Sequence, residues 1–110
     1  MIDWTRVTEL RDEIGAEDFQ EVIDLFLEEV EGTLDTLTSL TNAAALEAAY
    51  HFLKGGALNL GFQAMAELCQ SGEASAGLGQ MDGVDPDEVM RVYAISKAQF
   101  LDGMQERFAA

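Results

Sequence analysis

The residues best suited to chemistry lie in one segment, around His51, the single histidine in a chain of 110 residues. Lys54 follows three positions later, and Gly55 and Gly56 follow at four and five. Residues three or four apart share one face of a helix, so an imidazole, an ammonium group and a position without a side chain would meet there. An imidazole is a nucleophile, and a nearby ammonium group can neutralise an anion that becomes attached to it. The pattern therefore predicts that another molecule closely approaches His51.

Other catalytic patterns are missing from the sequence. With one histidine and one cysteine, Cys69, a Ser-His-Asp arrangement could form only around His51, and no nucleophile elbow presents a serine. A di-iron site in a helical bundle needs paired Glu-x-x-His motifs, whereas Glu47 precedes His51 by four positions and this pair occurs once. Neither of the common glycine-rich phosphate-binding motifs is present. We therefore expect no hydrolase, no metal site, no nucleotide site and no bound cofactor.

Length and composition indicate one domain over residues 1–110, because 48% hydrophobic and 25% charged residues are typical of a globular chain. The 21 acidic and 6 basic residues give a net charge of -15, which repels nucleic acid backbones and anionic lipid surfaces. A single cysteine, no signal sequence and no long apolar run favour a cytoplasmic location. We expect a monomer, because the predicted helices leave no second apolar face.

The elements that must position His51 are helices, since apolar residues recur at spacings of three and four and the chain has only one proline. The expected helices run from Asp3 to about Gly15, from Phe19 to about Leu37, from residue 43 to 60, from about Phe62 to an undefined end among glycines, and from Pro86 to the C-terminus. Acidic residues cover the outer face of the second helix. The predicted fold class is all-α: an antiparallel four-helix bundle with a short additional N-terminal helix as a cover.

The third expected helix carries its core residues on one stripe, which comprises Leu46, Ala49, Tyr50, Leu53, Ala57 and Leu60. His51 lies off this stripe, so its imidazole should face solvent. Gly55 and Gly56 would each cost this helix roughly 1 kcal/mol relative to alanine. Two explanations remain open: they admit another molecule to the imidazole, or they permit close packing between helices.

The string from His51 to Phe62, His-Phe-Leu-Lys-Gly-Gly-Ala-Leu-Asn-Leu-Gly-Phe, resembles the signature of histidine-containing phosphotransfer (HPt) domains. In that signature, His is followed by x-Leu-Lys-Gly-Ser/Gly and later by Leu-Gly, which Leu53, Lys54, Gly55, Leu60 and Gly61 match. Gly56 stands where a serine is common, and glycine has no hydroxyl group that could contact a phosphate. Chain length and helix order are also similar to the family.

The resemblance implies that His51 accepts a phosphoryl group from the aspartyl phosphate of a receiver domain and passes it to another receiver. Lys54 would stabilise phosphate charge, and Gly55 and Gly56 would leave steric access. The partners would be response-regulator receiver domains, a hybrid histidine kinase, or both, and the receiver would supply Mg²⁺. The protein would then be a phosphoryl carrier without ATP-dependent kinase activity of its own.

A short-lived complex needs apolar surface around the acceptor. The residues expected to dock the partner are Phe52, Leu58, Ala48 and, on the second helix, Leu25. For these side chains, additional core contact is the competing interpretation. Two other functions remain open for the whole chain: an acidic helical adaptor that binds a signalling partner without phosphotransfer, and a scaffold with no site.

Overall fold

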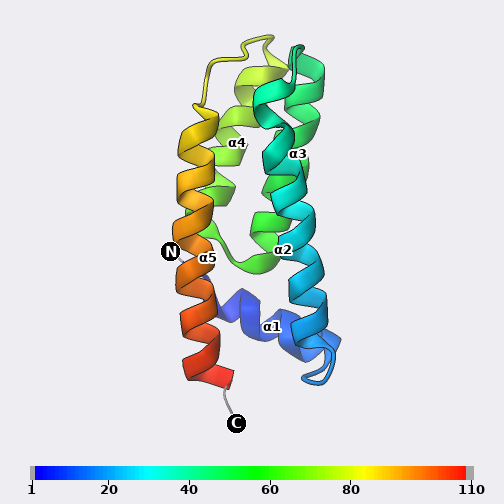
Figure 1. The fold of residues 1–110 in the computed structure, drawn as a ribbon, viewed down its shortest axis with the longest axis vertical. Helices are drawn as coiled ribbons and strands as arrows, with labels where there is room; N and C mark the ends of the chain where they lie inside the picture. Colours follow the sequence, from blue (N-terminus) through cyan, green and yellow to red (C-terminus); the bar gives the residue numbers. More distant parts are fainter. Residues whose placement is uncertain (1, 109–110) are drawn as a thin grey trace.

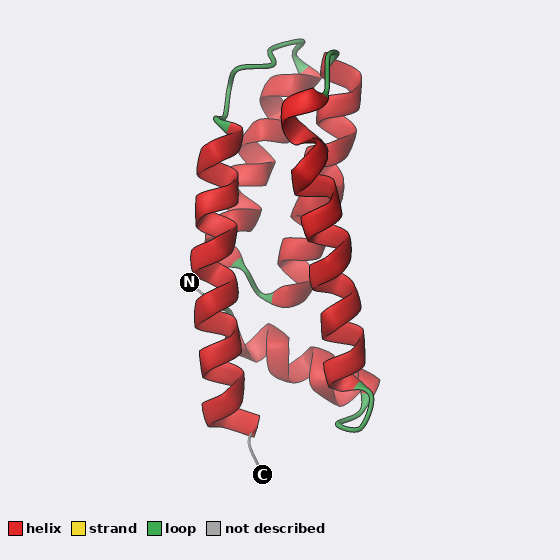
Figure 2. Ribbon diagram, viewed as in Figure 1, coloured by secondary structure: helices red, strands yellow, loops and turns green. Residues whose placement is uncertain are grey.

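A computed structural model describes residues 2–108, which form five α-helices and one short 3-10 turn (Figures 1 and 2). The elements are α1 (Trp4–Ile14), α2 (Phe19–Thr36), η1 (Leu37–Ser39), α3 (Ala43–Leu60), α4 (Gln63–Gly77) and α5 (Pro86–Phe108). The predicted all-α class is confirmed. None of the helices in this part of the chain is long and apolar enough to cross a membrane.

The four longer helices lie side by side along a body of 47 × 20 × 20 Å, and α1 lies across one end (Figure 1). α2 and α5 extend beyond the turn that joins α3 to α4, and α1 occupies the space next to this turn (Figure 1). The backbone N–H of Asp3 donates to the carbonyl of Gly61 at 2.7 Å, which ties the start of α1 to this turn. The expected N-terminal cover is therefore confirmed.

Local signals explain where the helices begin. The Asp3 side chain accepts from the N–H of Arg6 at 3.2 Å, and the Asn42 side chain accepts from the N–H of Ala45 at 2.8 Å. Asp85 Oδ1 accepts from the N–H of Asp87 at 3.0 Å, and Pro86 occupies the first helical position.

One glycine is required where α3 ends. Gly61 has φ +74°, and a Cβ atom there would lie 2.7 Å from the Asp3 carbonyl oxygen. Both the left-handed backbone and the contact with the start of α1 exclude a side chain at this position.

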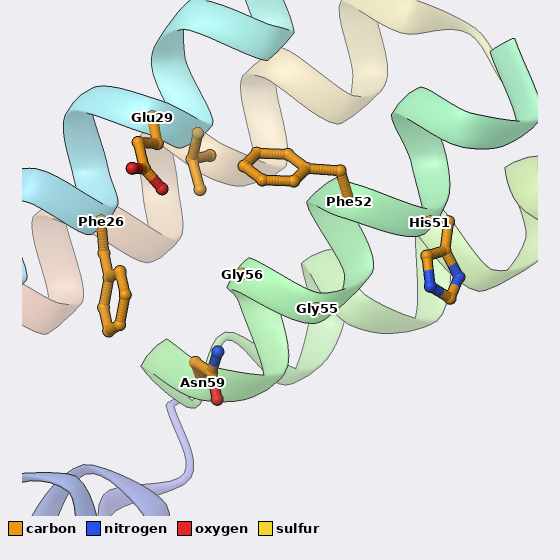
Figure 3. Close-up of a pocket in the computed structure, with 8 residues that line it drawn as sticks. Phe26, Glu29, His51, Phe52, Gly55, Gly56 and Asn59 are labelled. Carbon is orange, nitrogen blue, oxygen red and sulfur yellow. The ribbon is translucent and has the colours of Figure 1, made fainter. Parts of the chain in front are cut away.

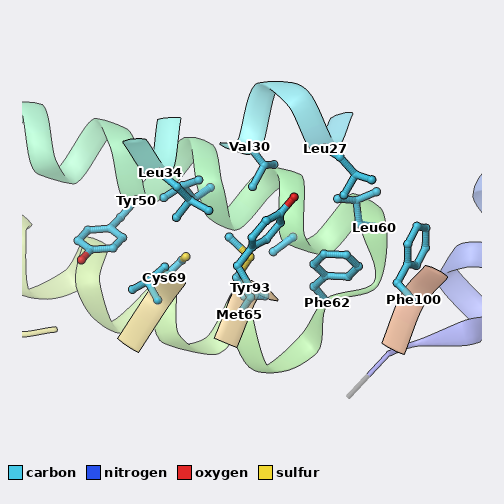
Figure 4. Close-up of a cluster of buried hydrophobic side chains, with 14 of the residues drawn as sticks. Leu27, Val30, Leu34, Tyr50, Leu60, Phe62, Met65, Cys69, Tyr93 and Phe100 are labelled. Atoms are coloured by element: carbon cyan, nitrogen blue, oxygen red, sulfur yellow. The ribbon is translucent and has the colours of Figure 1, made fainter. Parts of the chain in front are cut away.

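The core runs along the bundle between the four longer helices (Figure 4). The predicted stripe of α3 is confirmed in outline, with Ala49 only half-buried. On α2 the apolar residues face the core as well, with Val22 and Phe26 half-buried. The buried residues of α5 are Val89, Tyr93, Ser96, Phe100 and Met104, whereas Leu101 is 40% exposed. The glycine-rich end of α4 remains helical through Gly77.

Candidate functional site

His51 lies on the outward face of α3, and 71% of its side chain is exposed. The neighbouring residue Tyr50 and, two positions on, Leu53 point into the core and are almost fully buried. Because Tyr50 and Leu53 point inward, the rotation of α3 about its own axis is fixed, and the imidazole of His51 lies in solvent. The expected exposure of His51 is confirmed.

A groove of about 300 Å³ lies beside His51, between α3 and α2 (Figure 3). It is lined by Phe26, Glu29 and Val30 of α2 and by His51, Phe52, Gly55, Gly56 and Asn59 of α3. The Phe52 ring points toward α2, whereas His51 projects away from it (Figure 3). The groove thus places apolar aromatic surface next to an exposed nucleophile.

The two glycines after Lys54 have different surroundings. A Cβ atom at Gly55 would meet nothing within 4 Å, so this position leaves open surface one turn from the imidazole. A Cβ atom at Gly56 would lie 2.9 Å from Cγ2 of Val30, so this glycine lets α3 pack closely on α2. Close helix packing therefore accounts for Gly56, whereas Gly55 has open space beside it and makes no such contact.

The side chains expected to dock a partner are all exposed. Leu25, Phe52 and Leu58 expose 53%, 44% and 56% of their surface, and Ala48 is exposed as well. Of these four residues, only Phe52 lines the groove. Leu58 and Ala48 extend the His51 face along α3, whereas Leu25 lies on α2 away from the groove lining.

Two residues of α4, Gln70 and Glu73, complete the surroundings of His51 and Lys54. Glu73 Oε2 lies 2.8 Å from His51 Nδ1, and Glu73 Oε1 lies 2.6 Å from Lys54 Nζ. Lys54 also donates to Gln70 Oε1 at 2.9 Å. Lys54 is therefore held by α4, whereas the sequence suggested that it was free to meet an incoming anion.

Glu73 is ionised at neutral pH. The Lys54 ammonium and, second, the hydrogen bond with His51 hold the pKa of Glu73 below its ordinary value. Glu47, which precedes His51 by four positions on α3, is not the carboxylate beside the imidazole. Glu47 Oε2 instead lies 2.8 Å from the place where a Cβ atom on Gly77 would stand, so Glu47 points toward the far end of α4.

Sequence reasoning missed Gln70 and Glu73. The only signal in the sequence was their spacing of three on the fourth helix. This spacing places both side chains on one face of the helix, to one side of the buried Cys69. Within residues 2–108, no group of three or more His, Cys, Asp or Glu side chains is arranged to hold a metal ion.

Comparison with protein families gives one match. The family model described as "Hpt domain" matches residues 21–107, which include α3, α4, nearly all of α2 and α5, and every residue of the groove. Comparison with curated proteins and with solved structures gives no match.

Proposed function

The chain belongs to the Hpt domain family, and from this premise we propose that His51 is its phosphoryl acceptor. Hpt domains carry out histidine phosphotransfer in phosphorelays and interact there with receiver domains and kinases. In our proposal, His51 takes a phosphoryl group from the aspartyl phosphate of one receiver domain and gives it to the aspartate of another.

The observation that carries this proposal is the exposed imidazole at the edge of an apolar groove. Nδ1 of His51 is engaged by Glu73, and the other ring nitrogen, Nε2, makes no hydrogen bond within the described residues. A receiver that covers the groove could bring its aspartyl phosphate to Nε2 in line for attack. Phosphoryl transfer depends mainly on such alignment and on charge stabilisation, so a carrier needs little more than an accessible nucleophile.

Lys54 would stabilise the charge of the phosphoryl group. An ammonium group about 6 Å from phosphate contributes on the order of 1 kcal/mol per unit charge after screening by water, and the Lys54 ammonium is also paired with Glu73. Lys54 would therefore assist transfer without being sufficient for it. The remaining charge stabilisation would come from the receiver, which would supply Mg²⁺ and the acidic residues that bind it. With no nucleotide-binding motif in its sequence, the protein would act as a carrier and not as an ATP-dependent kinase.

The groove and the exposed residues Phe52 and Leu58 would form the centre of the docking surface, with Ala48 beside them. Leu25 would contribute at its margin. Such a surface suits a transient complex, which buries a modest apolar patch and then dissociates. We propose that the protein acts as a monomer in the cytoplasm.

The test is transfer from purified receivers that carry radioactive aspartyl phosphate. Label that is stable to base and labile to acid should appear on the wild-type protein and be absent from His51→Gln. Transfer to no receiver of the source organism would contradict the proposal. Binding of a receiver that is equal in both proteins, with no label on either, would instead support the acidic adaptor.

A further inference from the structure

The groove beside His51 contains one acidic side chain, Glu29 of α2. The other residues that line it are apolar or polar without a carboxylate, and no lysine or arginine is among them. The Glu29 side chain is exposed and extends from α2 toward the groove (Figure 3). It makes no ion pair or hydrogen bond in the part of the chain that the structure describes. The groove therefore carries one acidic group that the fold itself does not use.

The protein has no basic side chain left to pair with Glu29. All six lysine and arginine residues lie within residues 2–108, and each contacts another group of the fold. Four form ion pairs and two lie over aromatic rings: Arg6 with Glu9 and Glu13, Lys54 with Glu73, Arg91 with Glu88, Lys97 with Glu31, Arg11 over Phe108, and Arg107 over Trp4. A cation for Glu29 therefore has to come from another molecule.

The surroundings of Glu29 suit an ion pair that forms only in a complex. Phe26 and Val30 lie beside it on α2, and the Phe52 ring points toward it from α3 (Figure 3). A partner that covers these apolar groups excludes water, and opposite charges attract more strongly where water is excluded. A carboxylate that is covered without a cation loses its hydration and gains nothing in return. The same charge thus favours one kind of partner and rejects another.

We propose that Glu29 is a specificity-determining residue of the docking surface, and that the receiver seated on the groove places a lysine or arginine side chain against it. This inference rests on the proposed function, because it takes a receiver as the occupant of the groove. The net charge of -15 attracts basic surfaces of any kind. Glu29 adds a position, because it requires one cation of the receiver beside the apolar side chains that fill the groove. Receivers without a cation at that position are rejected.

Two variants change the charge at this position. Glu29→Gln removes the charge and nearly keeps the size of the side chain, and Glu29→Lys reverses the charge. The matched control is Glu28→Gln, which alters the net charge as much as Glu29→Gln does but lies at an exposed position outside the groove lining. Thermal unfolding of the three variants establishes that each is folded before any comparison is made.

The first measurement is the dissociation constant for an unphosphorylated receiver, the one that binds the wild-type protein most tightly among the purified receivers of the source organism. It should rise about threefold in Glu29→Gln and about tenfold in Glu29→Lys, where two cations would face each other. Both losses should shrink as salt concentration rises. Glu28→Gln should change the constant much less. Equal effects of Glu28→Gln and Glu29→Gln, or binding of no receiver at all, would overturn the proposal.

The second measurement locates the cation on the receiver. Its surface lysines and arginines are changed to glutamate one at a time, and each variant is tested for binding to Glu29→Lys. One of them should bind about fivefold more tightly than the unchanged receiver does, because the ion pair is restored with its charges exchanged. If none of the receiver variants restores binding, Glu29 does not face a receiver cation and the proposal is wrong.

Phosphoryl transfer from the same receiver separates this inference from the proposed function. Binding that depends on Glu29, with no label on His51, would contradict the proposed function and leave the docking inference standing. Label on His51, with the half-maximal rate at the same receiver concentration in Glu29→Gln and Glu28→Gln, would contradict the docking inference alone.

Discussion

The ring of Tyr50 on α3 lies directly against the backbone of Gly72 on α4. A Cβ atom at Gly72 would come 2.7 Å from Cε2 of the ring and 2.8 Å from Cδ2 and Cζ. Tyr50 is 1% exposed, so its ring has no free space into which it could withdraw. The sequence left the end of this helix undefined among its glycines, and the contact shows that α3 packs closely on α4 at Gly72. It also fixes how α4 sits on α3, because Tyr50 directly precedes His51 and Gly72 directly precedes Glu73.

Gly72→Ala should therefore destabilise the protein, although alanine favours a helix. Overpacking of a well-filled core costs typically about 1–3 kcal/mol, which exceeds the gain of up to about 1 kcal/mol from replacing a helical glycine. Urea unfolding followed by circular dichroism at 222 nm measures the free energy of unfolding. A variant as stable as wild type would show that the ring can move aside.

Gly55→Ala should have the opposite effect on stability. Its Cβ atom would meet no other atom within 4 Å, so the gain in helix propensity of about 0.5–1 kcal/mol is unopposed. The same urea titration measures this gain in the free energy of unfolding.

Gly55→Leu should keep the helix at least as stable as wild type and slow transfer from a receiver, because its side chain would project beside the imidazole. Unchanged transfer in Gly55→Leu would contradict a role for this position in access.

The exposure of His51 could be predicted from the sequence because it depends only on the rotation of one helix. Six core residues at helical spacing fix the rotation of α3, and His51 follows from it. The edges of the buried stripe of α5 are less well determined by the sequence: Val89 and Leu101 are both apolar, and nothing local decides that α5 buries the first and exposes the second. That choice depends on the position of α5 against its neighbours.

The bridge from Glu73 to His51 and Lys54 could not be predicted, because it joins residues 22 and 19 positions apart on two different helices. It depends on how far α4 is shifted along its axis relative to α3. That register follows from contacts such as Tyr50 on Gly72, which leave no periodic trace in the sequence. The different surroundings of Gly55 and Gly56 have the same origin, since only the position of Val30 on α2 distinguishes them.

Lys54→Ala should lower the rate of phosphoryl transfer modestly, by about fivefold, if its ammonium group contributes on the order of 1 kcal/mol to charge stabilisation. The loss should shrink as salt concentration rises, because the interaction is electrostatic and partly exposed. The rate is measured in transfer reactions from a phosphorylated receiver that are stopped at timed intervals, at several salt concentrations. Lys54→Arg, which keeps the charge, is the matched control. An effect that is identical in the two variants would assign the role of Lys54 to its shape and not to its charge.

The last prediction concerns a second cluster, where α2 meets α5. Glu31 Oε2 accepts from the Tyr93 hydroxyl at 2.5 Å and from Lys97 Nζ at 2.6 Å. The sequence predicts that the acidic residues of α2 cover its solvent-facing side, but Glu31 connects α2 to α5 instead. The hydrogen bond from Lys97 and then that from Tyr93 hold the pKa of Glu31 below its ordinary value, against a smaller opposing effect of burial. Burial, with Glu31 second, raises the pKa of Tyr93, so its hydroxyl remains a donor.

Because the folded pKa of Glu31 is lower than the unfolded one, the folded state binds fewer protons between the two values, and stability rises with pH there. The contribution is complete above the ordinary value of 4.5 and is lost as pH falls through the folded pKa. The Glu31 side chain is 43% exposed, so we expect Glu31→Gln to cost about 0.5–1.5 kcal/mol at pH 7. Urea unfolding from pH 7 to pH 3 should show the difference from wild type shrinking below pH 4.5. Glu28→Gln, at an exposed position on the same helix, should match wild type more closely at pH 7. A Glu31→Gln deficit that stays constant down to pH 3 would mean that shape, and not charge, joins α2 to α5 here.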